Sequence, residues 1–516
     1  MVGASTNSPW LIAGARLCED LKTGRLSEPV DVRLGEGRIL ELAPSAANRS
    51  TDAAAVIDAA GMLLFPGLVN SHFHSTGTFN RAFVANLPLE LFMLYELPRF
   101  DFGPFPPELY RTQVLWAASQ MLKAGVTSVF DDAMFYPAPS DEAVAGMMGA
   151  YGDSGIRATV AVYLPNKVEY EWIPGLRDLL PSDVVVRMDE GVPAVDELVG
   201  FYERFIGRWH GADGGRLRCA LSCSAPQRAT DDYMTRLHAL STELDLPFVF
   251  HVYETKLQRV AADAFYGTSM IRHLRELGVL GRRSVIVHAV WVDESDIDDL
   301  AEAGALVVHS PSGNLRCGSG VMPYRQLRDA GVPVALCTDE ATVEDRCNLW
   351  QVGRLAGMLH TIGDPHHRTW PRAEEMLNAM TETGGRCLGV EGLGTIGVGA
   401  PADLILLDLE RILDTPIAKL ANTLVYGEDG SSVRAVFVDG RLVVRDGRLT
   451  TIDEHQLRRD LARWSSHWAE AVEPVERWAA RLAPAYEEIY ARCAHADAGI
   501  NRWAGNEGQW LGRAAR

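Results

Sequence analysis

Hydrophobic and polar residues alternate with two different periods in the middle of the chain. Short apolar runs are separated by longer segments whose apolar side chains recur every three or four positions. The first pattern is typical of buried strands and the second of amphipathic helices. Eight strand–helix units of this kind predict a (β/α)₈ barrel, the TIM-barrel fold. The candidate strands lie at 63–74, 125–132, 155–163, 216–222, 246–251, 284–288, 305–309 and 332–339.

The two ends of the chain have a different pattern of apolar and polar residues. Residues 1–65 contain short alternating segments separated by glycine and aspartate, and residues 391–453 have the same pattern. An Asp-Gly pair at 439–440 between two alternating segments is a strong hairpin signal. We therefore expect a small β-sandwich domain built from both of these parts, with the barrel at 66–390 between them. The tryptophan-rich segment 454–516 is expected to form a helical extension that packs on the barrel or on a partner subunit.

The composition is that of an ordinary globular protein, with 47% hydrophobic and 23% charged residues in a chain of 516. We find no uncharged apolar run of the ~18 residues that a membrane span requires, and no secretory signal at the N-terminus. A net charge of −19 argues against nucleic acid and anionic membranes as partners. The eight cysteines include no CxxC pair and are expected to be free thiols in a reducing compartment. We expect a cytoplasmic location.

Several candidate strands end in side chains that bind metals. His72 and His74 close the first strand, and because alternate side chains of a strand point the same way, they face one side together. His251 ends the fifth strand and Asp339 the eighth, and barrel enzymes place their chemistry at these strand ends. Three imidazoles and one carboxylate form an N₃O ligand set for a divalent ion, with room left for water. His288 and His309 also end candidate strands. A single histidine at a strand end is more often a core residue, but packing alone does not explain five such histidines together with an aspartate.

Glu254 lies three residues after His251, at the start of a loop from which it can reach a metal-bound water. A divalent ion lowers the pKa of such a water towards 7, which makes hydroxide available near neutral pH. The proton must then be carried to the leaving group, and a carboxylate beside the metal suits that role. The alternative is that Glu254 is a surface or helix-capping residue.

These residues belong to longer motifs through which the chain resembles the amidohydrolase superfamily. The resemblance is to its mononuclear-metal branch of aminohydrolases, chlorohydrolases and deaminases, which includes cytosine, guanine and S-adenosylhomocysteine deaminases and triazine hydrolases. It covers about residues 8–453. The motifs are PGLVNSHFH (66–74), HVYE (251–254), VIVHAVWVDESD (285–296), VVHSPSGNLRCGSGVMP (307–323), CTDE (337–340), GTIGVGAPADLILLD (394–408) and VFVDGRLVVRDGRL (436–449).

The resemblance implies one divalent metal ion, Zn²⁺ in preference to Fe²⁺, held by His72, His74, His251 and Asp339. It also implies that Glu254 carries protons to a ring nitrogen and to the leaving group. His288 matches the histidine that orients the nucleophile, and Asp339 would also accept the proton of the water. The fourth candidate strand has no lysine at its end that could bridge two metals, which favours a single ion.

One motif departs from the family. Many deaminases of this branch carry a histidine after strand four, in a context like HAPYT, whereas this chain has CSAPQRAT at 223–230. Ser224 stands where that histidine would fall, and Gln227 stands for the aromatic residue. We expect both residues to contact the substrate and to do so differently from the family.

The loops after strands one and seven supply further candidates. The loop at 76–98 is long and aromatic, which suits either a lid over a planar substrate or ordinary packing at the barrel mouth. His309 is expected to be a scaffold residue near the site, with direct contact to the substrate as the alternative, and Arg316 is expected to face the pocket. The acidic run at 339–345 either forms a solvated loop or favours a cationic amidine or guanidine as substrate.

We therefore predict a metal-dependent hydrolase of non-peptide C–N bonds that deaminates an amino-substituted N-heterocycle or a cyclic amidine or guanidine. Hydrolysis of an amide, a carbamoyl compound or a C–Cl bond is the alternative, because the metal ligands do not determine the leaving group. A non-catalytic structural homologue is a remote alternative, since every ligand and Glu254 are present. Members of the family are commonly oligomeric, and we expect a homodimer that acts on a small molecule.

Overall fold

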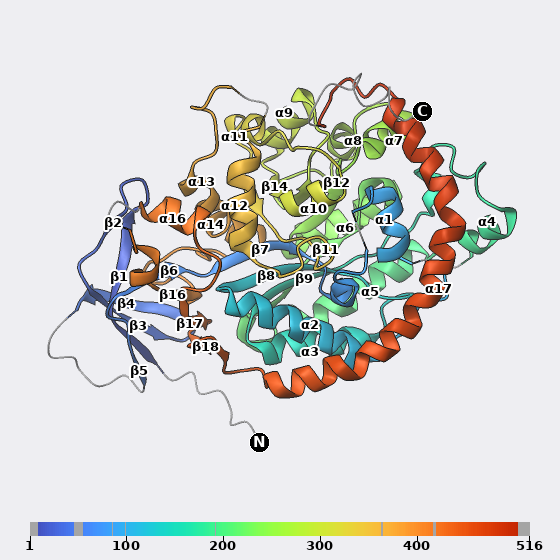
Figure 1. Cartoon of the computed structure of the whole chain (residues 1–516). Helices are drawn as coiled ribbons and strands as arrows, with labels where there is room; N and C mark the ends of the chain where they lie inside the picture. The colour runs from blue at the N-terminus through green and yellow to red at the C-terminus, as the bar shows by residue number, and fades with distance from the viewer. Residues whose placement is uncertain are drawn as a thin grey trace.

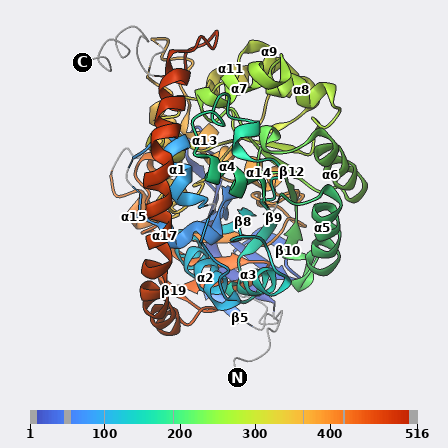
Figure 2. The same cartoon turned by 90° about the vertical axis from the view of Figure 1, so that its right-hand side faces the viewer.

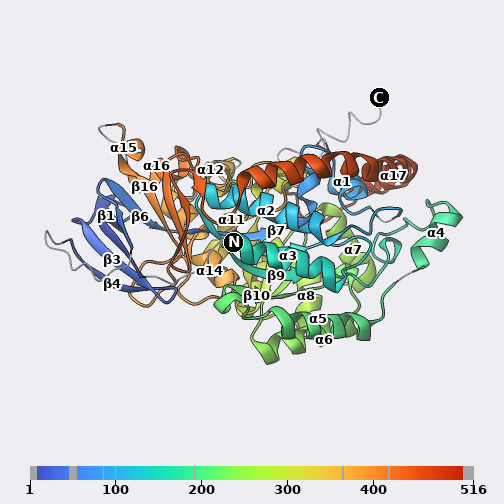
Figure 3. The ribbon, with the colours of Figure 1, turned by 90° about the horizontal axis from the view of Figure 1, so that it is seen from below.

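A computed structural model describes residues 9–45, 55–84, 86–98, 100–190, 192–362, 365–415 and 419–503. Figure 1 shows a barrel with a small β-domain on one side and a long C-terminal helix along the other. Seen from below, in Figure 3, the β-domain and the end of this helix lie at opposite ends of the molecule.

Within the described residues, eight parallel strands form the barrel, and the predicted TIM-barrel fold is confirmed. The fourth strand is interrupted at Ala220, so that its first piece pairs with strand three and its second piece with strand five. A parallel bridge between Phe73 and Asp339 joins the last strand region to the first. The strands are β7 (Leu68–Phe73), β8 (Val126–Ala133), β9 (Arg157–Val162), β10 (Leu217–Cys219) with β11 (Leu221–Ser222), β12 (Phe248–Val252), β13 (Ser284–His288), β14 (Leu306–His309) and β15 (Val334–Leu336).

Helices surround the barrel and cover its mouth. Those that connect or follow the first five strands are α1 (Leu89–Glu96), α2 (Pro107–Lys123), α3 (Asp141–Ser154), α4 (Ser182–Asp189), α5 (Val195–Trp209), α6 (Asp231–Leu244), α7 (Lys256–Tyr266) and α8 (Met270–Glu276). Those that follow later strands are α9 (Glu294–Ala303), α10 (Pro311–Arg316), α11 (Tyr324–Asp329), α12 (Leu349–Leu359), α13 (Ala373–Ala379) and α14 (Glu382–Cys387). Short 3-10 turns are η1 (Ser75–Asn80), η2 (Glu169–Glu171), η3 (Asp213–Gly215) and η4 (Pro226–Arg228).

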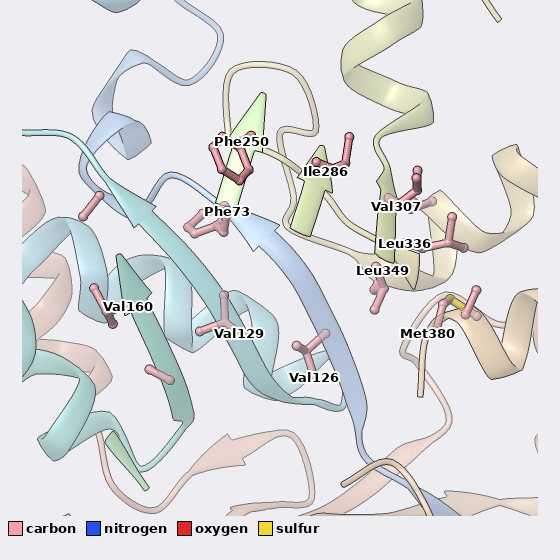
Figure 4. Packing of buried hydrophobic residues seen from close by; sticks show 14 of the residues in the cluster. Phe73, Val126, Val129, Val160, Phe250, Ile286, Val307, Leu336, Leu349 and Met380 are labelled. Carbon is pink, nitrogen blue, oxygen red and sulfur yellow. The ribbon is translucent and has the colours of Figure 1, made fainter. Parts of the chain in front are cut away.

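Two apolar layers lie on the two sides of the barrel strands. Each strand contributes to the interior layer, for example through Val249 and Cys337. The alternate residues of the strands pack outwards against the helices, as Figure 4 shows for Val129, Ile286 and Val307. Because side chains alternate across a strand, the layer to which a residue belongs predicts where the residue two positions later points.

The β-domain combines strands from both parts of the chain, which pair in one ten-stranded sheet. Its strand order is β19-β18-β17-β16-β6-β1-β3-β4, with β2 and β5 also paired to β1. The bounds are β1 (Trp10–Asp20), β2 (Arg25–Leu26), β3 (Val30–Gly35), β4 (Arg38–Pro44), β5 (Ala55–Asp58), β6 (Met62–Pro66), β16 (Leu404–Asp408), β17 (Val433–Val438), β18 (Arg441–Arg445) and β19 (Arg448–Leu449); helices α15 (Leu409–Ile412) and α16 (Leu420–Tyr426) follow β16. Asp439 and Gly440 form the turn of the predicted hairpin with φ of 52° and 71°.

The candidate strand at 63–74 is in fact two strands, β6 in the β-domain and β7 in the barrel. Gly67 separates them at a point of very close packing. A Cβ atom at this position would lie 2.2 Å from the Thr127 hydroxyl oxygen, which leaves space only for glycine. The continuous apolar run hid this boundary, because both strands are buried.

The described part of the C-terminal extension, up to residue 503, contains one helix, α17 (Glu454–His495). It contacts α1, α2 and α7, and Figure 2 shows it running beside α1. None of the helices in the described ranges is both long enough and apolar enough to cross a membrane. All eight cysteines are free, as predicted.

Candidate active site

Three imidazoles meet at the C-terminal mouth of the barrel. The Nε2 atoms of His72 and His74 are 3.1 Å apart, and that of His251 lies 3.1 and 3.3 Å from them. The prediction that His72 and His74 face one side is therefore confirmed. All three side chains are buried.

The proton positions on two of these rings follow from their partners. His74 Nδ1 lies 2.6 Å from the backbone carbonyl of Asp132, and His251 Nδ1 lies 2.7 Å from the backbone carbonyl of Ser224. A carbonyl oxygen only accepts, so both Nδ1 atoms carry the proton and both Nε2 atoms present lone pairs. Lone pairs that face each other at 3.3 Å repel unless a cation lies between them. The three nitrogens thus fit a metal ion.

Asp339 places a carboxylate oxygen, of the kind that zinc accepts, near two of the imidazoles. Its Oδ1 lies 3.9 Å from His72 Nε2 and 3.7 Å from His74 Nε2, while Oδ2 accepts a hydrogen bond from the Ser310 hydroxyl at 3.0 Å. Metal–ligand bonds of about 2 Å at tetrahedral angles place ligand atoms a little over 3 Å apart. The set fits a three-nitrogen, one-oxygen site that closes slightly when an ion binds.

The electrostatics of the three imidazoles differ. Burial lowers the pKa of His72 and of His251 well below the usual histidine value, with the neighbouring imidazoles adding to the effect. Burial also lowers the pKa of His74, but the carboxylates of Asp339 and Glu340 outweigh it and leave that pKa raised. Neutral imidazoles are the form that binds a metal.

The layer of the residue two positions earlier matches the directions of His251, Asp339 and His309. His251 follows Val249 by two positions and Asp339 follows Cys337 by two, and both of these earlier residues lie in the interior layer. His309 follows Val307 of the outer layer, and its Nε2 lies 3.0 Å from Nε2 of His360, directly after α12. His309 is thus a packed scaffold residue.

Glu254 and His288 lie beside the imidazole cluster. Glu254 Oε2 is 3.2 Å from His288 Nε2, and His288 Nδ1 is 3.1 Å from the side-chain nitrogen of Asn314. The amide nitrogen donates to Nδ1, so Nε2 carries the ring proton and donates it to the carboxylate. Burial raises the pKa of Glu254 well above its usual range, to which Asp339 contributes, and lowers the pKa of His288 to about 4.

The backbone is strained where these strands end. Ser224, Tyr253, His288 and Asp339 have φ values of 72°, 54°, 76° and 64°, in the left-handed region that favours glycine. Such strain clusters at functional sites. For His288 it has a visible effect, because the preceding Val287 belongs to the interior layer and simple alternation would turn the imidazole away from the cavity.

A cavity lies in front of the imidazoles and is lined by His74, His251, Glu254 and His288. Two buried carboxylates of this cavity were not singled out from the sequence. Glu96, at the end of α1, and Glu340, next to Asp339, both line it. Asn80 donates to one oxygen of Glu96 at 3.1 Å, and the carboxyl groups of Glu96 and Glu340 interact with each other. Burial raises the pKa of Glu96 to about 7 and that of Glu340 well above its usual range. The acidic run at 339–345 is therefore not a solvated loop at Glu340.

Arg228 is a further cavity residue that the sequence reasoning missed, although it lies within CSAPQRAT. Its guanidinium stacks on Tyr163 and Trp172, with 5.8 and 4.9 Å to the ring centroids, and donates to the Tyr163 hydroxyl. Burial lowers its pKa to about 10. Only its position after strand four could have drawn attention to it.

The structure does not bring the predicted substrate contacts into this cavity. Among the described residues, its lining does not include Ser224, Gln227, His309 or Arg316. Ser224 instead holds His251 through its backbone carbonyl, and Gln227 is buried in η4. Arg316 pairs with Asp345 at 2.8 Å and donates to the Val84 carbonyl.

Comparisons with known proteins agree with this geometry. A model of the amidohydrolase family matches residues 63–443. A 5-methylthioadenosine/S-adenosylhomocysteine deaminase of Desulforudis audaxviator is 31% identical over 446 residues, which cover 86% of this chain and 95% of the relative. An adenosine deaminase structure from Xanthomonas campestris with bound zinc has a TM-score of 0.76 at 25% identity, covering 89% of this chain and 98% of that chain. An atrazine chlorohydrolase structure from Arthrobacter aurescens in complex with zinc has a TM-score of 0.76 at 26% identity, covering 88% and 99%.

Proposed function

Because the chain belongs to the amidohydrolase family, we propose that it is a metal-dependent hydrolase that deaminates an amino-substituted N-heterocycle or cyclic amidine. The observation that carries the proposal is the meeting of three Nε2 atoms within 3.3 Å, two of them with lone pairs set by carbonyl partners. We assign His72, His74, His251 and Asp339 as ligands of one divalent ion. Zinc is the preferred ion, because two similar structures contain it.

When bound, the ion would lower the pKa of a water molecule and so supply the nucleophile. Glu254 is the group that donates one proton to the ring nitrogen, takes up a second proton from the added water, and passes that second proton to the leaving amine. Its raised pKa suits this role, because a carboxyl group that retains a proton near neutral pH can act as an acid. Asp339 is assigned as the base that accepts the proton of the water.

His288 acts from the other side of Glu254. Its Nε2–H donates towards the site while the ring stays neutral, because its pKa is about 4. A fixed neutral donor in a buried site can stabilise negative charge that develops on the substrate. Burial of the whole cluster excludes bulk water from these proton transfers.

A second candidate reaction is hydrolysis of a C–Cl bond, which the similarity to an atrazine chlorohydrolase favours. The ligand set serves both reactions, so the leaving group must be tested directly. Cleavage of an amide or carbamoyl compound stays a prediction from the sequence.

The proposal is tested by ammonia release across aminopurines, aminopyrimidines, pterins, aminotriazines and cyclic guanidines, with zinc-loaded and iron-loaded protein. The Glu254→Gln variant is the matched negative control, because glutamine keeps the shape of the side chain and removes the group that carries the proton. We expect ammonia from at least one class and none from the variant. Chloride release from chlorotriazines without ammonia would select the second reaction, and silence in both assays from metal-loaded protein would contradict the proposal.

Two other expectations remain predictions. A homodimer would appear in sedimentation as twice the chain mass of 56.6 kDa. A cytoplasmic location would appear as co-fractionation with soluble cell contents.

A further inference from the structure

A second, larger cavity adjoins the cavity at the imidazoles. We call the cavity lined by His74, His251 and Glu254 the inner cavity, and the larger one the outer cavity. Their volumes are about 50 and 750 Å³. Leu97, Met134, Tyr163 and Arg228 line both. A ligand held at the imidazoles can therefore extend into the outer cavity.

The walls of the outer cavity are mainly apolar and aromatic. They come from the loops after the first strands, from α4 and α5, and from α17. The volume lies within the range of small-molecule sites, which are about 300–1,000 Å³. A bare heterocycle at the imidazoles would leave these walls in contact with water, and this is unfavourable for apolar surface. Prominent apolar members of the lining are Leu94, Phe100, Trp172, Ile173, Phe201 and Leu482.

Two charged residues of this lining have partners among the described residues. Arg187 stacks on Phe100 and on Trp478, with 4.5 and 5.0 Å to the ring centroids, and pairs with Asp101 at 3.0 Å. Arg204 donates to the Gly200 carbonyl of its own helix at 2.9 Å. The outer cavity therefore offers a ligand mainly aromatic and aliphatic surface, with Glu90, Lys167 and Glu190 as further charged groups of the lining.

One wall of the outer cavity is formed by α17, which lies outside the segment that matches the family. The match ends at residue 443 and α17 begins at Glu454. Leu482 and Tyr486 of α17 line the outer cavity and pack in one apolar cluster with Trp172 and Ile173.

Polar contacts hold this helix in place over the cavity. Trp478 Nε1 donates to Asp101 at 2.8 Å, and Arg481 pairs with Asp183 of α4 at 2.6 Å. These contacts tie α17 to the chain after α1 and to α4, two elements that contribute residues to the same lining. The wall that α17 provides is thus fixed relative to the rest of the outer cavity.

We propose that the outer cavity is a second substrate subsite that binds an apolar, ring-sized substituent of the heterocycle, and that α17 sets how large this substituent can be. The inference rests on the proposed function for the identity of the reacting group. It adds that the substrate has two parts, with its amino-heterocycle in the inner cavity and its apolar substituent between Trp172, Phe201 and Leu482.

The first test probes the outer cavity without any reaction. Binding of 8-anilinonaphthalene-1-sulfonate to the zinc-loaded protein is measured by fluorescence titration. We expect one bound probe per chain, a loss of affinity of about tenfold or more in Leu482→Trp, and no loss in Ala480→Trp, which introduces the same side chain at an exposed position of α17. Absence of binding, or equal binding by both variants, would overturn the proposal.

The variants must be compared as folded proteins. Circular dichroism and zinc content should match the wild type. If Leu482→Trp does not fold, Leu482→Ala replaces it, and the enlarged cavity should then change the affinity for the probe while Ala480→Trp does not. Unchanged affinity in Leu482→Ala would count against the proposal in the same way.

The second test compares ammonia release from adenine, 9-methyladenine and 9-benzyladenine. We expect kcat/KM to rise about tenfold or more with the benzyl group, Leu482→Trp to remove that gain, and Ala480→Trp to keep it. Release from adenine with no preference for the substituent would overturn this inference and leave the proposed function intact. A third outcome is that probe binding depends on Leu482 but no heterocycle of the wider panel releases ammonia. This outcome would overturn the proposed function, and with it the proposal that the outer cavity binds a substituent of a heterocyclic substrate.

Discussion

Glu254 and His288 form a hydrogen-bonded pair at 3.2 Å in which the proton position is set from behind by Asn314. Asn314 donates to Nδ1, so the ring proton sits on Nε2 and points at the carboxylate. Asn314 is thereby a positioning residue for His288, because the ring proton would otherwise be free to sit on either nitrogen.

Glu254→Gln should abolish turnover while the protein keeps its metal. Glutamine cannot take up and release a proton, and loss of a general acid–base group costs about 10²–10⁴-fold in rate. The measurement is kcat for ammonia release, with zinc content as the control. Activity within about threefold of the wild type at equal zinc content would show that another group carries the proton.

Asn314→Asp should invert the proton position on His288. A carboxylate at 314 accepts from Nδ1–H, which leaves a lone pair on Nε2 facing Glu254. We expect kcat/KM to fall by roughly 10–100-fold and its pH profile to move, whereas Asn314→Ala should cause a smaller loss. Identical profiles in wild type and Asn314→Asp would rule out this role.

Removal of the metal should destabilise the fold. Two Nε2 lone pairs within 3.3 Å of each other repel without a cation, so the described arrangement gains from binding one. A ligand that binds only the folded state at roughly a hundred times its Kd adds about 3 kcal/mol to the free energy of unfolding. Chelation should therefore lower the Tm, and added zinc should restore it. A Tm that responds to neither treatment would contradict the metal site.

Ionisation of Glu344, which lies outside the cavity, should lower the free energy of unfolding as the pH rises. Burial raises the pKa of Glu344 to about 7, and its side chain accepts from the Asn348 backbone at 2.7 Å. The folded-state pKa exceeds the unfolded value near 4.3, so the folded form holds the proton more tightly and this contribution is lost as the pH rises from about 4 to 7.

Glu344→Gln isolates this effect because it keeps the acceptor oxygen. Urea unfolding at pH 5 and pH 8 is the measurement. The free energy of unfolding of the variant should be closest to that of the wild type at pH 5. At pH 8 it should be higher than that of the wild type by up to about 3 kcal/mol, which corresponds to a pKa shift of roughly two units or more. A constant difference at both pH values would place the pKa of Glu344 near its ordinary value.

The sequence was sufficient for the barrel and for the directions of His251 and Asp339, because both depend on local alternation. In β7 the register shifts between Asn70 and Phe73, so simple alternation from Val69 does not place His72 and His74. The interior position of Val249 carries over to His251, and that of Cys337 to Asp339. The same rule, applied to Val307, would have turned His309 outwards, where it contacts His360. The alternating pattern that gives the direction of His309 was available in the sequence, but the prediction used only its position at the end of a strand.

Other parts of the site depend on geometry that no local pattern encodes. His288 turns into the cavity through a φ of 76°, which a sequence rule for strands does not predict. Glu96 reaches the inner cavity from the end of α1 and Arg228 from the 3-10 turn η4, two elements whose positions are set by packing against distant parts of the chain. The contribution of α17 to the outer cavity arises because a segment beyond the barrel folds back over its mouth.

The pairing of β6 with β16 has a consequence for how the chain is made. Leu63 in β6 pairs with Leu407 in β16, a residue that the ribosome adds only after the entire barrel. Until then one edge of β6 has no strand beside it, and open strand edges promote association between chains. The barrel must therefore acquire its structure beside an unfinished domain. Slow synthesis after residue 390, or premature termination before β16, is the condition under which this protein should aggregate in the cell.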